Sequence, residues 1–157
     1  MSDRVEAVER AFNFRRVDDR LTTSGLVPPD ALAELGRDGV DAVIDLLPAT
    51  VDHAVAGEAE IVAGQGIDYV AIPVDYEAPT RADFDAFVRA MDEHAGQRVH
   101  VHCAANYRVS AFYALYAELR GRWTREQADA FVADLWDPAA SPPWPEFMAD
   151  DRARFAP

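Results

Sequence analysis

A short segment in the second half of the chain combines side chains typical of a nucleophilic site. It contains Cys103, which is the single cysteine, and Arg108 soon after it, within the sequence HCAANYRVS over residues 102–110. A thiolate is a nucleophile, and a guanidinium offers paired planar donors to the oxygens of an anion. These residue types in one segment therefore predict covalent chemistry on an anionic group.

The elements on either side would position this segment. The sequence VHVH over 99–102 predicts a buried strand, and the apolar, aromatic run from about Val109 to Gly121 predicts a buried helix. Cys103 would then lie below the amides that open the helix, where the partial positive charge favours a thiolate and binds an oxyanion.

The loop itself is built of residues that allow a tight curve. Two small alanines follow the cysteine, and asparagine tolerates the left-handed backbone that anion-binding loops require. The expected phosphate-binding residues are Ala104, Ala105, Asn106, Tyr107, Arg108 and Val109. The alternative interpretation is an inert, buried cysteine.

The segment resembles the active-site loop of cysteine-dependent protein tyrosine and dual-specificity phosphatases. That loop reads His-Cys, five residues, Arg, and then Ser or Thr. The resemblance extends through VDDRLTTSGLVPPDALAELGRDGVDAVIDLLP (17–48) and YVAIPVDYEAPTRADFDAF (69–87) to the final helices. The chain looks most like small bacterial phosphatase-like proteins.

The resemblance assigns roles residue by residue. It implies that Cys103 is the nucleophile, that His102 braces the loop, and that the Ser110 hydroxyl assists breakdown of a phosphocysteine. The family arginine falls on Val109, because the arginine of this chain stands one position earlier, at Arg108. Valine cannot grip phosphoryl oxygens, so activity depends on whether Arg108 points into the loop.

Three functions remain open at this point. The first is a phosphatase that hydrolyses a phosphomonoester through a phosphocysteine. The second is a catalytically impaired, regulatory phosphate-binding module. The third is a sulfurtransferase, since the spacing of Cys103 and Arg108 resembles that of rhodanese-type enzymes, although AIPVDYEAPT (71–80) matches the phosphatases instead.

Hydrolysis through a thiolate needs a general acid that protonates the leaving oxygen and later a base that activates water. Asp75 follows the predicted strand 67–73 and matches the general-acid loop of the resembled family, with Glu77 as the second choice. The alternative is a solvated carboxylate in a turn.

Two histidines, His100 and His102, share one face of the predicted strand, as metal-binding pairs do. A third ligand at a recognisable spacing is missing, so we expect no metal and no other cofactor, and His100 is interpreted as structural. Asp45 in the apolar run AVIDL is expected to hydrogen-bond the base of a loop.

Composition limits the partners. The chain carries 28 acids and 15 bases, a formal net charge of -13, and every base is arginine. This charge disfavours nucleic acids and anionic membranes, and the lack of lysine excludes Schiff-base chemistry. The expected partner is a phosphorylated small molecule or protein, and the sequence leaves the oligomeric state open.

Length and patterning predict one phosphatase-like domain over residues 1–157. The N-terminus lacks the apolar core of a secretory signal, and a lone thiol fits a reducing compartment, so a cytoplasmic location is expected.

Strand patterns alternate with helix patterns, which predicts an α/β fold of three layers with a short, mostly parallel central sheet flanked by helices. We expect one or two strands within 12–21, a turn at 23–25, strands at 42–46 and 67–73, and helices that begin at Asp52, Thr80 and Thr124. The Pro-rich segment 136–147, which carries Trp136, Trp144 and Phe147, is expected to wrap across the domain as a lid over hydrophobic surface.

Overall fold

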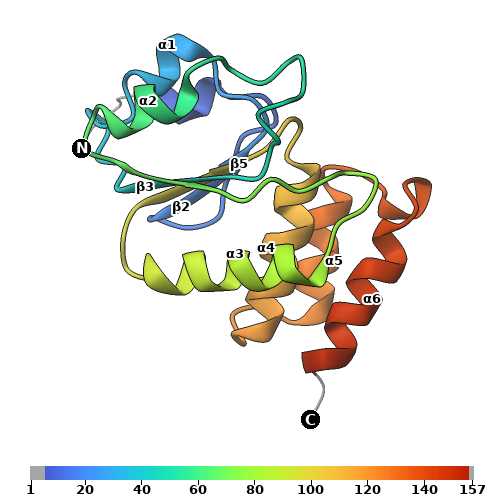
Figure 1. Ribbon diagram of the computed structural model, residues 1–157. Helices are drawn as coiled ribbons and strands as arrows, with labels where there is room; N and C mark the ends of the chain where they lie inside the picture. The colour runs from blue at the N-terminus through green and yellow to red at the C-terminus, as the bar shows by residue number, and fades with distance from the viewer. Residues whose placement is uncertain (1–5, 156–157) are drawn as a thin grey trace.

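The computed structural model describes residues 6–155, in which five strands form a central sheet. Helices surround this sheet (Figure 1). The strands lie in the order β1-β2-β5-β3-β4. Only β1 is antiparallel to its neighbour, and the others run parallel. Their bounds are β1 (Arg15–Arg16), β2 (Leu21–Ser24), β3 (Ala42–Asp45), β4 (Asp68–Ala71) and β5 (Val99–His102). The predicted α/β class with a mostly parallel sheet is confirmed.

Helices cover both faces of this sheet, which gives three layers (Figure 1). One face carries η1 (Ala7–Arg10), α1 (Pro29–Leu32) and α2 (Glu58–Ala63). The other carries α3 (Arg81–Glu93), α4 (Tyr107–Leu119), α5 (Arg125–Ala133) and α6 (Trp144–Phe155), with η2 (Pro138–Ala140) before the last helix. Within residues 6–155, none of the helices is long and apolar enough to cross a membrane.

Alternation along the strands divides the core into two clusters. In β3, Ala42 and Ile44 pack towards α3 to α6, whereas Val43 packs towards α1 and α2. In β5, Val99 and Val101 belong to the first cluster. His100 and His102 alternate with these valines along β5 and therefore point to the opposite face, towards α2.

Side chains at the predicted helix starts form the expected caps. Thr80 accepts a hydrogen bond from the amide of Asp83, and Thr124 does the same for Gln127. In both cases the later side chain also accepts from the amide of the cap residue, which completes a capping box.

Two local predictions were wrong. The expected turn at 23–25 is largely strand, because Thr23 and Ser24 pair in register with Val101 and His102 of β5. The helix expected to begin at Asp52 begins at Glu58, after Gly57 in a left-handed conformation. In the segment 136–147, Trp136, Trp144 and Phe147 are part of the buried core.

The parallel register brings four strand ends to the same level of the sheet. Ser24, Asp45 and His102 are aligned across β2, β3 and β5, and Ala71 of β4 is aligned with Asp45. The loops that follow these strands therefore meet at one edge, where parallel sheets bind their ligands.

Candidate active site

Cys103 lies at the centre of this edge, directly after β5. Its amide donates to the carbonyl of Ser24 at 3.2 Å, which continues the pairing of β5 with β2. The residue is fully buried, at 0% exposure, and packs in the larger hydrophobic cluster. In this conformation the sulfur is shielded from solvent.

The loop after Cys103 is held against two segments, one that follows β2 and one that precedes β1. The carbonyl of Ala104 accepts from the amide of Leu26 at 3.0 Å, and the carbonyl of Ala105 accepts from the side-chain amide of Asn13 at 3.0 Å. Gly25 makes this approach possible, because a Cβ there would lie 2.4 Å from the carbonyl oxygen of Ala104.

Asn106 turns the loop into helix α4. Its φ is +69°, the left-handed conformation that its residue type predicts. Its side-chain amide donates to Thr23 Oγ1 at 3.0 Å and to the carbonyl of Asn13 at 2.9 Å. The first hydrogen bond of α4 runs from the Ser110 amide to the Asn106 carbonyl, so the amides of Tyr107, Arg108 and Val109 have no partner within the helix.

Arg108 lies in the first turn of α4 and is only 9% exposed. Its guanidinium carbon lies 5.3 Å from the centre of the Tyr76 ring, a cation–π contact with the loop after β4. Its Nε is buried and lacks a hydrogen-bond partner, and no carboxylate among residues 6–155 forms an ion pair with it. By contrast, Val109, at the family arginine position, is fully buried in the core.

The Ser110 hydroxyl is engaged on the side of α4 that faces Trp136. It donates to the carbonyl of Tyr107 at 2.9 Å and accepts from the Trp136 indole at 2.9 Å. Trp136 in turn stacks on Tyr107, with ring centres 4.9 Å apart. Sequence patterns did not connect Trp136 with the loop, because tertiary packing brings the two together.

Asp75 lies after β4 and is exposed, with its carboxylate accepting from the amide of Glu77 at 2.9 Å. Glu77 is exposed as well. The neighbouring Tyr76, which sequence reasoning missed, contacts Arg108 and donates from its hydroxyl to Ser141 Oγ at 2.7 Å. The loop that carries Asp75 is therefore joined to the Cys103 loop through Tyr76 and Arg108.

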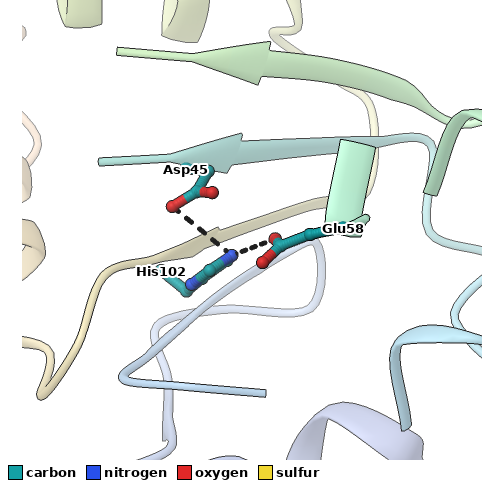
Figure 2. Close-up of side chains that lie close together, drawn as sticks. All are labelled: Asp45, Glu58 and His102. Carbon is teal, nitrogen blue, oxygen red and sulfur yellow. Dashed lines mark hydrogen bonds and ion pairs between the residues drawn. The ribbon is translucent and has the colours of Figure 1, made fainter. Parts of the chain in front are cut away.

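Behind Cys103, on the α2 side of the sheet, His102 lies between two carboxylates (Figure 2). Its Nε2 donates to Glu58 and lies 3.6 Å from an Asp45 oxygen. Its Nδ1 donates to the carbonyl of Cys103 at 3.3 Å. Asp45 also accepts from the Tyr69 hydroxyl at 2.6 Å and from the Leu47 amide at 2.9 Å.

These neighbours determine the charge of His102. Burial lowers the pKa of His102, but the hydrogen bond with Glu58 and the charges of Asp45 and Glu58 outweigh burial and raise the pKa to about 9. Burial, followed by the bond to Asp45, raises the pKa of Tyr69. The cluster therefore holds an imidazolium between two carboxylates and a neutral phenol at neutral pH.

His100 has a different set of partners. Its Nδ1 lies 2.7 Å from Thr22 Oγ1, and its Nε2 lies 2.8 Å from Ser24 Oγ. Burial, with a smaller effect from the charge of His102, lowers the pKa of His100 to about 3. Since Ser24 Oγ donates to the carbonyl of Gly25, it accepts from Nε2–H, and Nδ1 accepts from Thr22.

Asp45, Glu58 and His102 each offer a ligand atom of the kind that metals use, and these atoms lie within 4.8 Å of one another. Ligands of a tetrahedral zinc ion, at about 2.0–2.1 Å from it, are about 3.3 Å apart. His102 Nε2 and Glu58 Oε2 are instead in direct hydrogen-bond contact. This direct contact fits a proton held between the two atoms. Glu58 had no signal in the sequence.

Comparisons with known proteins identify a family model and solved structures that match this chain. A family model described as a polymorphic toxin system DSP-PTPase phosphatase matches residues 24–117. A candidate phosphatase (DUF442) from Shewanella putrefaciens CN-32 is 35% identical, with a TM-score of 0.85 over 97% of this chain and 99% of its own. No curated protein matches the chain significantly.

More distant structures share the fold. Tk-PTP in its active form has a TM-score of 0.70 at 18% identity, over 91% of this chain and 95% of its own. A cysteine-to-serine form of TpbA from P. aeruginosa, in complex with phosphotyrosine, has a TM-score of 0.69 at 16% identity, over 92% of this chain and 90% of its own. The resemblance inferred from the sequence is confirmed.

Proposed function

Because the chain belongs to the DSP-PTPase phosphatase family of polymorphic toxin systems, we propose that it hydrolyses a phosphomonoester through a covalent phosphocysteine on Cys103. The substrate is a phosphorylated small molecule or protein. Of these, a phosphoprotein is supported by the fold shared with TpbA, whose structure contains phosphotyrosine. The net charge of -13 argues against nucleic acids as partners.

One observation carries this proposal. The Arg108 side chain is only 9% exposed, its Nε is buried without a hydrogen-bond partner, and it extends from the helix turn whose three amides have no partner within α4. A buried cation without a carboxylate is costly unless an anion completes it. Amides at a helix start and an arginine fork together match the oxygens of a phosphoryl group.

The chemistry proceeds in two displacements. The thiolate of Cys103 attacks phosphorus, so that an S–P bond forms while the ester P–O bond breaks. Asp75 donates a proton to the leaving oxygen. Water then attacks phosphorus, Asp75 accepts its proton, the S–P bond breaks, and inorganic phosphate and the thiolate are released. Ser110 is assigned to the second displacement, as the family pattern implies.

Arg108 takes the role of the clamp on the phosphoryl oxygens in this scheme. Val109 is buried in the core and has no charge, so it cannot replace the family arginine. The contact of Arg108 with Tyr76 is then its resting position, and a bound phosphoryl group competes for the guanidinium. Because Tyr76 directly follows Asp75, this contact links the clamp to the general acid.

A second function, a phosphate-binding regulatory module without turnover, is favoured by two features. Cys103 is fully buried, and the Ser110 hydroxyl is engaged with Tyr107 and Trp136. A module of this kind would still bind oxyanions at the α4 amides and Arg108. Turnover is therefore the property that separates the two functions.

The test is hydrolysis of para-nitrophenyl phosphate by the wild type and single variants. We expect Cys103→Ser to abolish turnover and Arg108→Ala to lower it by about 100-fold or more, as loss of an oxyanion donor does. Asp75→Asn is expected to lower it by about 100-fold, the contribution of a general acid. Arg125→Ala, an exposed arginine on α5, is the matched control and should be unchanged.

Each contrary result points to a different function. Turnover that survives Cys103→Ser refutes the covalent mechanism. Tungstate binding without turnover by the wild type favours the regulatory module. Loss of activity in Glu77→Gln but not in Asp75→Asn moves the general acid to Glu77. Formation of thiocyanate from thiosulfate and cyanide would support a sulfurtransferase.

A further inference from the structure

The ring of His102 has acceptors at both nitrogens. Nε2 faces the carboxylates of Glu58 and Asp45, and Nδ1 faces the backbone carbonyl of Cys103. A neutral imidazole has one N–H and one lone pair. With both carboxylates ionised, a neutral His102 would place a lone pair against an acceptor oxygen in a fully buried site, so a doubly protonated ring satisfies this arrangement.

We propose that Glu58 is a positioning residue which, through the imidazolium of His102, holds the Cys103 carbonyl and thereby keeps the Cys103 loop in its anion-binding conformation. Figure 2 shows the connection: Glu58 on α2, Asp45 on β3, and His102 between them. The proposal rests on the proposed function in one respect, namely that this loop binds a phosphoryl group.

The contacts form a chain from helix α2 to the nucleophile. Glu58 is 6% exposed and meets His102 from a position 44 residues away in the sequence. His102 in turn donates a 3.3 Å hydrogen bond to the backbone carbonyl of Cys103, the residue that bears the sulfur. The other groups near the ring are accounted for: Tyr69 bonds Asp45, and His100 is bonded by hydroxyl groups.

Loss of one ring proton would break this chain. A ring that keeps Nδ1–H turns a lone pair towards the Glu58 carboxylate, and a ring that keeps Nε2–H releases the Cys103 carbonyl. The pKa of about 9 for His102 supports an intact chain at neutral pH and its loss in mildly alkaline solution. Anion binding by the loop should therefore weaken as the pH rises through 9.

Glu58→Gln is designed to remove a ring proton from His102 without changing the summed charge of Asp45, residue 58 and His102. In the wild type the three residues carry two negative charges and one positive charge. In the variant, a neutral His102 beside Asp45 leaves the same total of one negative charge. A change in anion affinity would then come from the lost imidazolium and not from overall charge. Glu60→Gln, an exposed carboxylate on the same helix, is the matched control.

The experiment combines two measurements on the full chain from pH 6 to 10. Nitrogen-15 NMR follows the ring of His102, assigned with a His102→Gln variant, and calorimetry follows the binding of tungstate, which stays a dianion in this range. In the wild type we expect both ring nitrogens to be protonated at pH 8 and tungstate affinity to fall around pH 9. In Glu58→Gln we expect a neutral ring at pH 8 and an affinity about tenfold lower.

Each contrary outcome overturns the proposal. It fails if the wild-type ring is neutral at pH 8, or if Glu58→Gln changes neither the ring titration nor tungstate affinity. It also fails if Glu60→Gln has the same effect, or if the wild type contains a stoichiometric metal that Glu58→Gln loses.

These results are independent of turnover. Cys103-dependent hydrolysis together with an unresponsive Glu58→Gln refutes this inference alone. The expected NMR and tungstate results without any hydrolysis refute the phosphatase function alone.

Discussion

His100 and His102 occupy nearly equivalent places, yet His100 is neutral and His102 is positively charged. Both lie on β5, both point to the face covered by α2, and both are fully buried, with ring centres 6.3 Å apart. The pKa of His100 is about 3, whereas that of His102 is about 9. Burial opposes the charged form of both rings, so burial alone does not explain the difference.

Their hydrogen-bond partners explain it. The hydroxyl groups of Thr22 and Ser24 on β2 satisfy a neutral His100, because one accepts and the other donates. The carboxylates of Asp45 and Glu58 and the Cys103 carbonyl only accept, so they require a cation at His102. Hydroxyl groups from β2 therefore keep His100 neutral, whereas carboxylates from β3 and α2 keep His102 charged.

The largest expected effect comes from removing the partner that makes His102 differ from His100. Glu58→Leu removes the main counter-charge of a buried imidazolium, so we expect the free energy of unfolding at pH 7 to fall by about 3–5 kcal/mol. Urea denaturation measures it. Glu60→Leu, at an exposed position on α2, should change it by less than about 0.5 kcal/mol. Equal effects of the two variants would contradict a buried ion pair.

A smaller effect should come from His100 in mildly acidic solution. Its folded pKa of about 3 is below the usual 6.5, so the unfolded chain takes up a proton that the folded chain refuses, and stability falls as the pH falls. Between pH 6.5 and 4.5 the wild type should lose about 2 kcal/mol more than His100→Gln. Equal losses in denaturation at these pH values would show that His100 is protonated in the fold.

The smallest effect on stability is expected from removing the Ser24 hydroxyl, which accepts a hydrogen bond from the neutral His100. Ser24→Ala removes the acceptor of the buried Nε2–H, so unfolding free energy should fall by about 1–2 kcal/mol. Thr22→Ser retains the other hydroxyl and should cost less. Thermal denaturation ranks the two, and a Ser24→Ala protein as stable as the wild type would mean that another group accepts this proton.

The sequence predicted much of the fold because strand and helix patterns are local. Buried strands at 42–46 and 99–102, and helices capped by Thr80 and Thr124, are present near the expected positions. The errors arose where tertiary pairing overrode local preference. Thr23 and Ser24 look like turn residues, yet they are strand because β5 lies beside them.

The candidate site was predicted in part. The position of Cys103 at a strand end and the left-handed Asn106 followed from residue types, and the structure has both. The contact of Arg108 with Tyr76 and the position of Trp136 against Ser110 did not follow, because they depend on how separate loops pack. The roles of these residues in catalysis remain predictions.

The sequence alone settles that an arginine stands one position before the family position, because covalent order sets that spacing. It also determined the strand, loop and helix that present Cys103, since their patterns are local. Folding settles where that arginine rests and which histidine is charged. Asp45, Glu58 and Tyr76 are distant in the chain, and a side chain acquires its charge and direction from neighbours that folding brings to it.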